Sequence, residues 1–283
     1  MASDILTRRS LLGRGAAAAS LALVGAPRLA RAESLTLAAV KAAGTLRIGC
    51  EAAYVPFTYR DDKGAIVGYD VELAQTVWAA HGVKPEFVDT AWAGVVPSLY
   101  AKKFDLVMSC MSYTAERVKR VGFSIPYAEA SQALLIRAAD KDKITKAEDL
   151  AGKVIGVKLG SPGEVLQKKL ADQKHIAYQD VRMFDDHPAA YIALAQDKVD
   201  VVFNTVPTLA IVMKDAPGKY AMVRGIGADN WAGIAGRQED VELIHHVDAV
   251  LTEMKADDRL YKLQEKWFGF RMQLADKVPT FDS

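Results

Sequence analysis

The sequence predicts an α/β protein built from two units that face each other across a cleft. Two observations carry this prediction. Short apolar strands alternate with helical segments along the chain, and the alternation runs twice with no flexible linker in between. Such alternation is typical of parallel sheets covered by helices. The 283 residues, 51% of them hydrophobic and 25% charged, suffice for one large or two medium cores.

The first alternating set begins at residue 45. We expect strands at 45–49, 85–89 and 105–109, and helices at 71–81, 93–103 and 115–120. Asp70 is expected to cap the first helix and Thr114 the last, because short polar side chains accept hydrogen bonds from free amides at a helix start. A turn at 61–64 and a glycine at position 82 separate these elements.

The second set begins near residue 145. We expect strands at 154–157, 181–184, 199–203 and 232–235, and helices starting at 162 and spanning 189–196, 241–255 and 260–267. The segment 145–148 has the form of a capping box before Leu150. Ser161 is a good cap for the helix that Pro162 begins, with Glu164 three residues further on.

The N-terminal segment has the form of an export signal. Arg8, Arg9 and Arg14 precede an apolar stretch at 15–27, and a small-residue site ends at Ala32. This order predicts a cleavable signal peptide over 1–32 and a periplasmic mature chain, because the apolar stretch is too short to span a bilayer. The Arg8-Arg9 pair indicates the twin-arginine route. The alternative is an exposed amphipathic N-terminal helix.

Charge, histidine and cysteine content exclude several classes of function. A formal net charge of +1 offers no electrostatic basis for binding nucleic acid or an anionic membrane. The five histidines and two cysteines lack metal-ligand spacing, so we expect neither a metal nor a cofactor. Cys50 and Cys110 are interpreted as two buried thiols, although an oxidising compartment would permit a disulfide.

Four segments, taken in order, resemble the polar amino-acid family of periplasmic binding proteins. They contain Tyr54-Val55-Pro56-Phe57 with Gly68-Tyr69-Asp70-Val71, Thr114-Ala115-Glu116-Arg117 with Phe123-Ser124-Ile125-Pro126-Tyr127, Gly160-Ser161, and Lys266-Trp267-Phe268-Gly269. The resemblance covers about residues 45–269. It implies a two-lobed periplasmic binding protein type II fold, in which each lobe is a mainly parallel sheet flanked by helices and hinge strands join the lobes. We expect lobe 1 over 33–137 and 230–283, and lobe 2 over 138–229.

The same resemblance implies the function. We expect the periplasmic solute-binding component of an ABC importer, a monomer that captures an amino acid or related small carboxylate by hinged closure and docks on an inner-membrane permease. Two alternatives remain open at this stage. One is an enzyme similar to the cyclohexadienyl dehydratases of this fold, although 205–208 lacks the acidic residues that such chemistry needs. The other is a periplasmic sensor or accessory protein without a transport role.

The resemblance assigns Arg117 to the ligand carboxylate and Ser112 to contacts beside it. A guanidinium is a planar fork of donors that matches a carboxylate, and a helix start adds amide donors and partial positive charge. Ser109 and Cys110, which precede this segment, are assigned to the same site. The alternative for Arg117 is an ordinary surface arginine on a basic helix.

Aromatic and acidic residues are assigned to the rest of the ligand. Tyr54 and Trp92 would flank it like two plates, which suits a cationic or planar group; alternatively, Trp92 only anchors its helix. Glu51 hints at a basic ligand, but a solvated glutamate at a strand end is equally ordinary. Ser161 would present its hydroxyl from the second lobe, whereas Pro162 has no N–H to offer.

Thr205 is the main departure from the family pattern. The family commonly has an aspartate at this position, which pairs with the ligand α-ammonium, and a threonine cannot neutralise that charge. Either Glu51 or the Asp185-Asp186 pair replaces it, or the ligand lacks a free α-ammonium. Asp185-Asp186 has its own alternative, a solvated turn before Pro188. Ligand identity therefore stays open.

Overall fold

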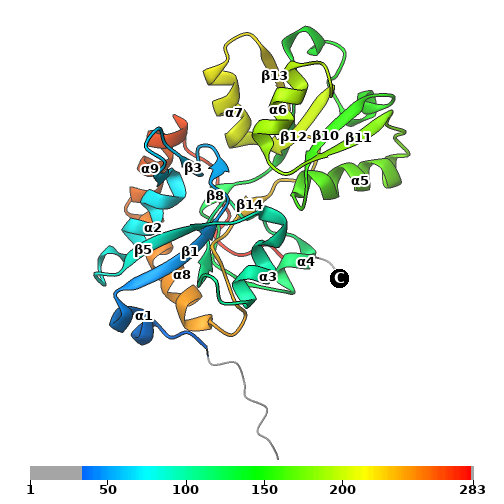
Figure 1. Cartoon of the computed structure of the whole chain (residues 1–283). Helices are drawn as coiled ribbons and strands as arrows, with labels where there is room; N and C mark the ends of the chain where they lie inside the picture. The colour runs from blue at the N-terminus through cyan, green and yellow to red at the C-terminus, as the bar shows by residue number, and fades with distance from the viewer. Residues whose placement is uncertain (1–33, 282–283) are drawn as a thin grey trace, which may run out of the picture. The chain divides into compact units, whose positions relative to one another are not determined.

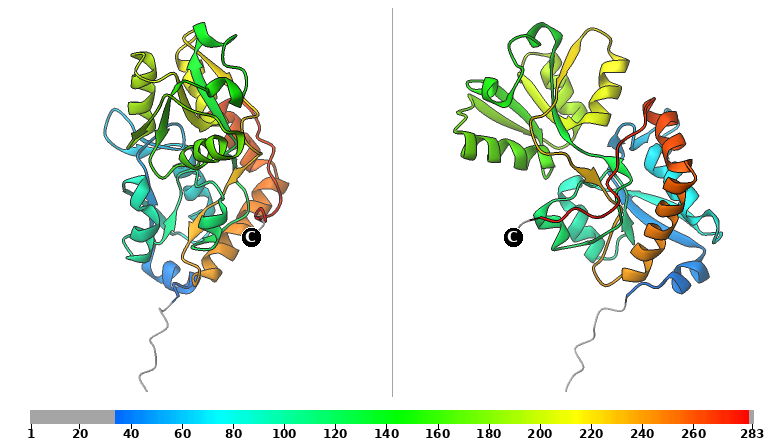
Figure 2. Two further views of the ribbon diagram at one scale, coloured as in Figure 1. Left: turned by 90° about the vertical axis from the view of Figure 1, so that its right-hand side faces the viewer. Right: turned by 180° about the vertical axis from the view of Figure 1, so that it is seen from behind.

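The structure is a computed structural model that describes residues 34–281, and it contains two five-stranded sheets with helices packed on them (Figures 1 and 2). The signal-peptide prediction over residues 1–32 lies outside the described residues. We call the elements of the first sheet and their helices the first lobe, and those of the second sheet the second lobe. The α/β class and the two-lobed arrangement are confirmed.

The first sheet has the order β5-β1-β6-β15-β7. Its strands are β1 (Thr45–Cys50), β5 (Lys84–Asp89), β6 (Leu106–Val107), β7 (Gly122–Phe123) and β15 (Ala235–Gly236). β1 runs parallel to β5 and β6, and β15 runs antiparallel to β6 and β7. Its helices are α1 (Leu37–Ala43), α2 (Tyr69–Ala79), α3 (Val95–Tyr100), α4 (Ala115–Val118), α8 (Val241–Ala256) and α9 (Arg259–Phe268), with the short 3-10 turn η1 (Trp92–Gly94). A small sheet made of β2 (Ala53–Tyr54), β3 (Thr58–Arg60) and β4 (Ile66–Val67) is counted with the first lobe, because Tyr54 shares a core cluster with Leu46 and Ile48 of β1.

The second sheet has the order β11-β10-β12-β9-β13. Its strands are β9 (Gln132–Arg137), β10 (Val154–Lys158), β11 (Asp180–Phe184), β12 (Val201–Thr205) and β13 (Tyr220–Val223). β10 is parallel to β11 and β12, whereas β9 is antiparallel to β12 and β13. Its helices are α5 (Pro162–Lys174), α6 (His187–Ala195) and α7 (Val206–Asp215), with the 3-10 turns η2 (Ala138–Asp140) and η3 (Ala147–Leu150).

Two segments cross between the sheets. The chain leaves the first lobe after β8 (Ala128–Glu129) and returns before β14 (Trp231–Ala232), and these two strands pair antiparallel. Beside them, the Ala130 amide donates to the Asn230 carbonyl at 2.8 Å, and the Asn230 amide donates to Ser131 Oγ at 3.1 Å. The two crossings therefore lie side by side and are hydrogen-bonded, which is the arrangement expected of a hinge.

The exact limits of the lobes stay a prediction. The sheet to which β9 belongs differs from the one that the predicted limit at residue 137 implies. The predicted limit put 132–137 in the first lobe, whereas β9 is hydrogen-bonded between β12 and β13 of the second sheet. The reason is burial on both faces: Leu134 and Ile136 belong to one core of the second lobe, and Ala133 and Leu135 to the other. A strand buried on both sides reads as a continuous apolar run without alternation, so its pattern did not mark it as a strand.

Most predicted elements are confirmed, with shifted ends. Three differ in kind. The segment 232–235 is two short strands, β14 and β15, in different sheets. The predicted helix 93–103 is η1 followed by the six-residue α3. In the predicted capping box the accepting carboxylate belongs to Asp149, which accepts from the Thr145 amide at 2.9 Å, and not to Glu148.

Asp70 does not cap α2, and this prediction was wrong. The helix begins two residues earlier, at Tyr69, with Gly68 as its cap residue and no side-chain cap hydrogen bond. The Tyr69 and Asp70 amides donate instead to the Pro56 and Phe57 carbonyls, at 2.9 and 3.0 Å. The Asp70 side chain is thereby turned into the core, where it is fully buried.

Candidate functional site

The predicted site residues lie at the carboxyl ends of parallel strands in both lobes. Glu51 follows β1, and the segment 109–112 follows β6. In the second lobe, Lys158 ends β10 and Thr205 ends β12. Loops at the carboxyl ends of parallel strands are where ligand sites form in α/β proteins, because adjacent strands deliver their loops to one edge. The topology therefore brings these residues together although they lie far apart in the sequence.

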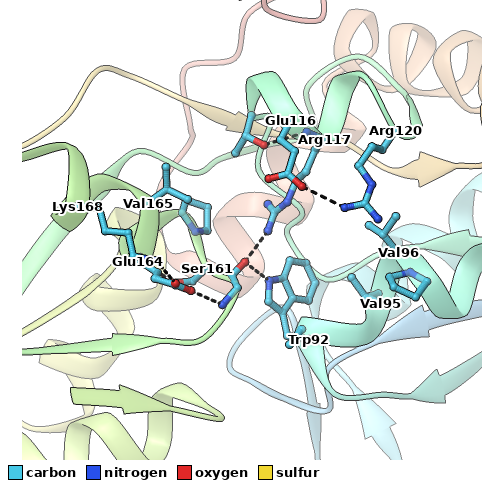
Figure 3. A pocket seen from close by; sticks show the side chains of 15 residues that line it. Trp92, Val95, Val96, Glu116, Arg117, Arg120, Ser161, Glu164, Val165 and Lys168 are labelled. Carbon is cyan, nitrogen blue, oxygen red and sulfur yellow. Dashed lines mark hydrogen bonds and ion pairs between the residues drawn. The ribbon is translucent and has the colours of Figure 1, made fainter. Parts of the chain in front are cut away.

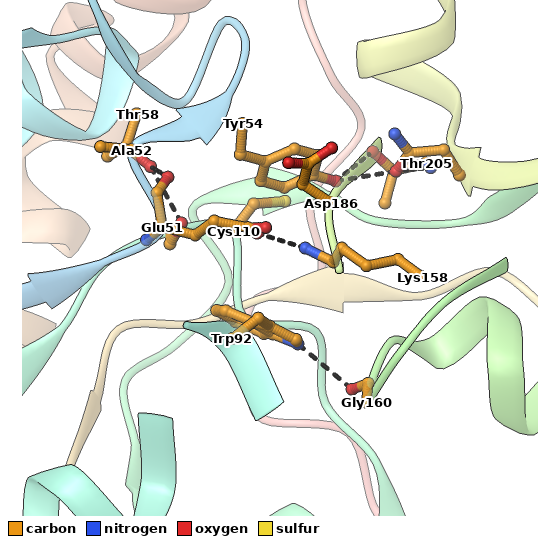
Figure 4. A network of polar contacts seen from close by, with 12 residues as sticks. Glu51, Ala52, Tyr54, Thr58, Trp92, Cys110, Lys158, Gly160, Asp186 and Thr205 are labelled. Atoms are coloured by element: carbon orange, nitrogen blue, oxygen red, sulfur yellow. Dashed lines mark hydrogen bonds and ion pairs between the residues drawn. The ribbon is translucent and has the colours of Figure 1, made fainter. Parts of the chain in front are cut away.

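A buried ion pair joins the two lobes at the centre of the site. Lys158 Nζ of the second lobe contacts Glu51 Oε2 of the first lobe, and both side chains are more than nine-tenths buried (Figure 4). Burial lowers the pKa of Lys158, and the Glu51 carboxylate acts in the opposite direction. The alternative of a solvated glutamate at this strand end does not hold, because Glu51 is 6% exposed.

Two aromatic rings enclose the same ammonium. Lys158 Nζ lies 5.0 Å from the ring centroid of Tyr54 and 5.0 Å from that of Trp92, both in the first lobe. Figure 4 shows the Lys158 side chain reaching between the two rings towards Glu51. Such distances are within the range of cation–π attraction. We refer to Glu51, Tyr54 and Trp92 as the cation cage.

A neutral polar cluster lies beside the cage. The Tyr54 hydroxyl hydrogen-bonds to Asn204 Oδ1 and to Thr205 Oγ1, each at 3.0 Å, so that these contacts also bridge the lobes. Thr205 Oγ1 is in turn 3.0 Å from Thr208 Oγ1. The position where the family pattern has an aspartate thus carries hydroxyl and amide groups, and its contacts include no carboxylate within the described residues.

Arg117 lies at the edge of the site and also bridges the lobes. Its Nη1 donates to the Ser112 carbonyl at 2.9 Å, and its Nη2 donates to the Gly160 carbonyl of the second lobe at 3.0 Å (Figure 3). The guanidinium carbon is 5.2 Å from the centroid of Trp92, whose Nε1 donates to the same Gly160 oxygen at 3.2 Å. Burial lowers the pKa of Arg117 to about 10, so the group stays cationic at neutral pH.

The local sequence explains how Arg117 is held. Thr114 caps α4 by accepting from the Arg117 amide at 3.1 Å, so the predicted cap is confirmed while the helix ends sooner, at Val118. A cavity of about 370 Å³ opens on the same side, lined among others by Trp92, Arg117, Ser161 and Glu164. Two of the five guanidinium N–H groups are used by carbonyl oxygens, so three remain for an anion.

The other predicted site residues surround a second, very small cavity. This cavity measures about 20 Å³, and Lys158 is among its lining residues. The predicted residues that line it are Tyr54, Trp92, Ser109, Cys110, Ser112, Ser161 and Thr205. Ser161 Oγ accepts from the Glu164 amide at 3.2 Å, which confirms the predicted cap of α5. Glu51 does not line this cavity, but it contacts Lys158, which does. Arg117 likewise lies outside it and donates a hydrogen bond to the carbonyl of Ser112, which lines it.

An apolar cavity continues from the site behind Tyr54 and His187. It measures about 290 Å³, and its lining includes Tyr191, Ile211 and Val212. His187 is stacked on Tyr54 with ring centroids 5.4 Å apart. Burial and, after it, the charge of Lys158 lower the pKa of His187 well below its ordinary value, so this histidine is neutral.

Asp186 and the two cysteines have structural roles in the described part of the chain. Asp186 caps α6 by accepting from the Ala189 amide at 2.8 Å, so one of its oxygens is engaged in the helix. Cys50 and Cys110 are buried free thiols, as predicted. The Cys110 amide donates both to Asp70 Oδ2, at 3.1 Å, and to the Tyr127 hydroxyl, at 3.0 Å.

Sequence reasoning missed Lys158 as a member of the site. Lys158 offered a local signal, since it is a charged residue at the end of an apolar strand that begins at Val154. Its partner Glu51 is 107 residues away in the chain, so no local spacing reveals the pair. Within residues 34–281, three or more potential metal ligands do not gather anywhere, and no helix is long and apolar enough to cross a membrane.

Comparison with known proteins places these features in context. A sequence model of the bacterial extracellular solute-binding proteins, family 3, matches residues 46–270. The L-cystine-binding protein TcyJ of Escherichia coli (strain K12) is 31% identical over 230 residues, covering 81% of this chain and 85% of that protein. An ancestral arginine-binding protein, solved bound to arginine, is 37% identical with a TM-score of 0.73, covering 80% of this chain and 99% of that one.

One further solved structure bears on the question of catalysis. The ancestral amino acid-binding protein AncCDT-1, described as a precursor of cyclohexadienyl dehydratase, is 35% identical with a TM-score of 0.75. The similarity covers 81% of this chain and 97% of that one. The similar proteins named so far are binding proteins, and one of them precedes an enzyme of the same fold.

Proposed function

The chain belongs to the bacterial extracellular solute-binding proteins, family 3, and we propose that it captures an amino acid or a related small carboxylate between its lobes. The observation that carries the proposal is the state of Arg117. Its guanidinium faces the site and donates hydrogen bonds to two neutral carbonyl oxygens. Three of its N–H groups are left for a ligand. A carboxylate is the anion whose geometry this fork fits.

Closure of the hinge is the proposed mechanism. The ligand first meets the first lobe through Arg117, Ser112 and the face of Trp92. The second lobe then closes over it with Ser161 and the Asn204–Thr205 segment. Binding shifts an open–closed equilibrium because the ligand touches groups of both lobes only in the closed form. The hydrogen-bonded crossings at Ala130 and Asn230 are the segments that would absorb the change.

Export and delivery complete the proposal. Residues 1–32 serve as a cleavable twin-arginine signal, the mature chain acts in the periplasm as a monomer, and its closed form is recognised by an ABC permease. Two relatives bind cystine and arginine by name, and both of these ligands carry an α-carboxylate. Replacing Arg8 and Arg9 with lysine should trap the precursor inside the cell, which cell fractionation would detect.

Binding rather than catalysis is the proposed activity. Proton transfer to or from a reacting ligand needs a positioned acid or base. Among the assigned site residues, the buried Glu51 carboxylate is held by Lys158, and Thr205 lies in a cluster of hydroxyl and amide groups. Incubation with prephenate or arogenate should therefore yield no aromatic product, and product formation above the level without protein would favour the dehydratase.

A thermal-shift screen tests the function directly. The mature chain is screened against amino acids, opines, cyclic and methylated amines, and simple carboxylates. A solute at about 100 times its Kd stabilises the folded form by roughly 2.7 kcal/mol, which raises the melting temperature by roughly 5–10 °C for a chain of this size. If no carboxylate or amino acid raises the melting temperature, the proposed function is wrong.

A further inference from the structure

We propose that Lys158 is a built-in cation that occupies the place of a cationic ligand side chain, so that this chain selects solutes without one. The inference rests on the proposed function and adds the ligand class to it. A cationic amino acid such as arginine presents a carboxylate at one end and a cation at the other. In this chain the groups suited to the second end are already engaged by Lys158.

The cation cage has the composition of a site for an ammonium or guanidinium group. The Glu51 carboxylate supplies a charge-assisted acceptor, and Tyr54 and Trp92 supply two ring faces at 5.0 Å. Carboxylate and aromatic faces together are how proteins hold organic cations. All three cage residues come from the first lobe, whereas the cation comes from the end of β10 in the second lobe. Closure of the lobes therefore delivers this cation into the cage.

The space left around Lys158 excludes a second cation. The cavity that it shares with Tyr54 and Trp92 measures about 20 Å³, which is enough for roughly one water molecule. The Lys158 side chain is 3% exposed. An incoming guanidinium would have to displace Lys158 and leave its ammonium without Glu51. An uncompensated buried charge is costly. The closed form should therefore bind a ligand with a cationic side chain with reduced affinity.

Attachment to the chain favours Lys158 over a free competitor. A group tethered next to its site acts at an effective concentration in the millimolar range or above. Once Glu51 and Lys158 cancel, Arg117 remains as a cation that no carboxylate of the described residues pairs with. Glu116 with Arg120 and Glu164 with Lys168, which line the larger cavity, pair with each other, and Asp186 caps α6. The cluster of Tyr54, Asn204 and Thr205 adds only neutral partners. The ligand is therefore a zwitterion or an anion with an uncharged or acidic side chain.

The test is to remove the built-in cation and supply one from solution. Lys158→Ala opens the cage, and n-butylammonium, which has the four carbons and the ammonium of a whole lysine side chain, should raise the melting temperature of this variant. L-arginine should bind Lys158→Ala at least about tenfold more tightly than it binds wild type by calorimetry. The control is Lys143→Ala, since Lys143 also pairs with a carboxylate but is 70% exposed. The control should behave like wild type with both compounds.

Two further variants keep the test decisive. If Lys158→Ala does not fold, Lys158→Ser is used instead. Its short side chain also leaves the cage open, and its hydroxyl can hydrogen-bond to water there. Adding Glu51→Gln to either variant removes the negative charge of the cage and should abolish the response to both n-butylammonium and L-arginine. Persistence of either response in that double variant would show that the cage is not the binding place, and the inference would be wrong.

The outcomes separate this inference from the proposed function. If wild type binds L-arginine as tightly as Lys158→Ala does, Lys158 is not a selectivity residue, although amino-acid binding stands. If n-butylammonium stabilises neither Lys158→Ala nor Lys158→Ser, the inference also fails. If n-butylammonium stabilises the variants while no amino acid or carboxylate binds any form, the cage is right and the proposed function is wrong.

Discussion

The two cations of the cleft, Lys158 and Arg117, differ in what neutralises them. Lys158 contacts the buried Glu51 carboxylate and two aromatic rings. Arg117 donates to two backbone carbonyls, and the salt bridges seen within the described part of the chain do not include it. Carbonyl oxygens carry only partial charge, so they orient a guanidinium without cancelling it.

This difference assigns the two cations different roles. A cation that is already paired and enclosed excludes other cations from its place, whereas an oriented and unneutralised one attracts an anion. The cleft therefore offers a ligand one cation that no carboxylate of the described residues pairs with, which is the requirement of a carboxylate.

Removing the unneutralised cation should affect ligand binding most. We expect Arg117→Ala to weaken binding of any carboxylate solute found in the thermal screen by about 2–5 kcal/mol, which is the usual cost of truncating one partner of a buried charge pair. Calorimetry measures the change. Lys119→Ala is the control, because Lys119 is an exposed cation two residues further on. Undiminished binding by Arg117→Ala would contradict the assignment.

Removing the partner of the neutralised cation should affect closure. Glu51→Gln leaves the Lys158 ammonium without a carboxylate, and this should disfavour the closed form by at least about 1–3 kcal/mol. We expect an increased radius of gyration by small-angle X-ray scattering, because opening lets water solvate Lys158. Glu86→Gln should leave the radius unchanged, since Glu86 faces Lys84 at the surface. An unchanged radius in Glu51→Gln would show that the ion pair does not hold the lobes together.

Asp70 offers the opposite case, a buried carboxyl that forms no salt bridge with a cation of residues 34–281. Burial raises its pKa from 3.8 to about 8, while its hydrogen bonds from Tyr127 and the Cys110 amide act in the opposite direction. The native state therefore holds the Asp70 proton more tightly than the unfolded state. This contribution to stability is fully present below pH 3.8 and is lost as the pH rises towards 8.

Asp70→Asn tests that sign. Between pH 4 and 8, the free energy of unfolding of wild type should fall relative to the variant by up to about 1.4 kcal/mol per pH unit. Urea unfolding at several pH values measures the difference, and Asp62→Asn, in an exposed turn, serves as the control. A difference that is constant over this range would mean that Asp70 does not titrate there.

The smallest effect concerns a hydroxyl already engaged by its own helix. Ser161 Oγ accepts from the Glu164 amide at 3.2 Å, so Ser161→Ala should reduce the free energy of unfolding by about 1 kcal/mol through loss of the cap. Thr36→Ala, which removes the cap of α1 far from the cleft, provides the comparison. Ser161→Ala should weaken ligand binding while Thr36→Ala does not; equal ligand affinity in both variants would remove Ser161 from the site.

Local patterns predicted the fold where burial is one-sided or a cap is present. β1 alternates, with Leu46 and Ile48 buried and Arg47 exposed, and Thr114 and Ser161 begin their helices as expected. β9 could not be predicted in this way, because both of its faces are buried and its pattern is uniformly apolar. Asp70 was misplaced because carbonyls distant in sequence, at Pro56 and Phe57, engage the start of α2.

Only those site residues that belong to a family motif could be predicted from the sequence. Most residues assigned from the family pattern line one small cavity, and their roles towards a ligand stay predictions. The departure at Thr205 was visible in the sequence, but its consequence was not. Glu51 suggested a basic ligand until the structure showed Lys158 in contact with it. A pairing between residues 107 positions apart follows from the topology of two sheets and not from any local spacing.

The most direct test of the division between the two cations is a crystal structure of the mature chain with the solute that the thermal screen identifies. This division predicts the solute carboxylate within hydrogen-bond distance of the Arg117 guanidinium, with the Lys158 ammonium still on Glu51 between Tyr54 and Trp92. A solute cation seated on Glu51 with Lys158 displaced, or a carboxylate bound away from Arg117, would contradict it.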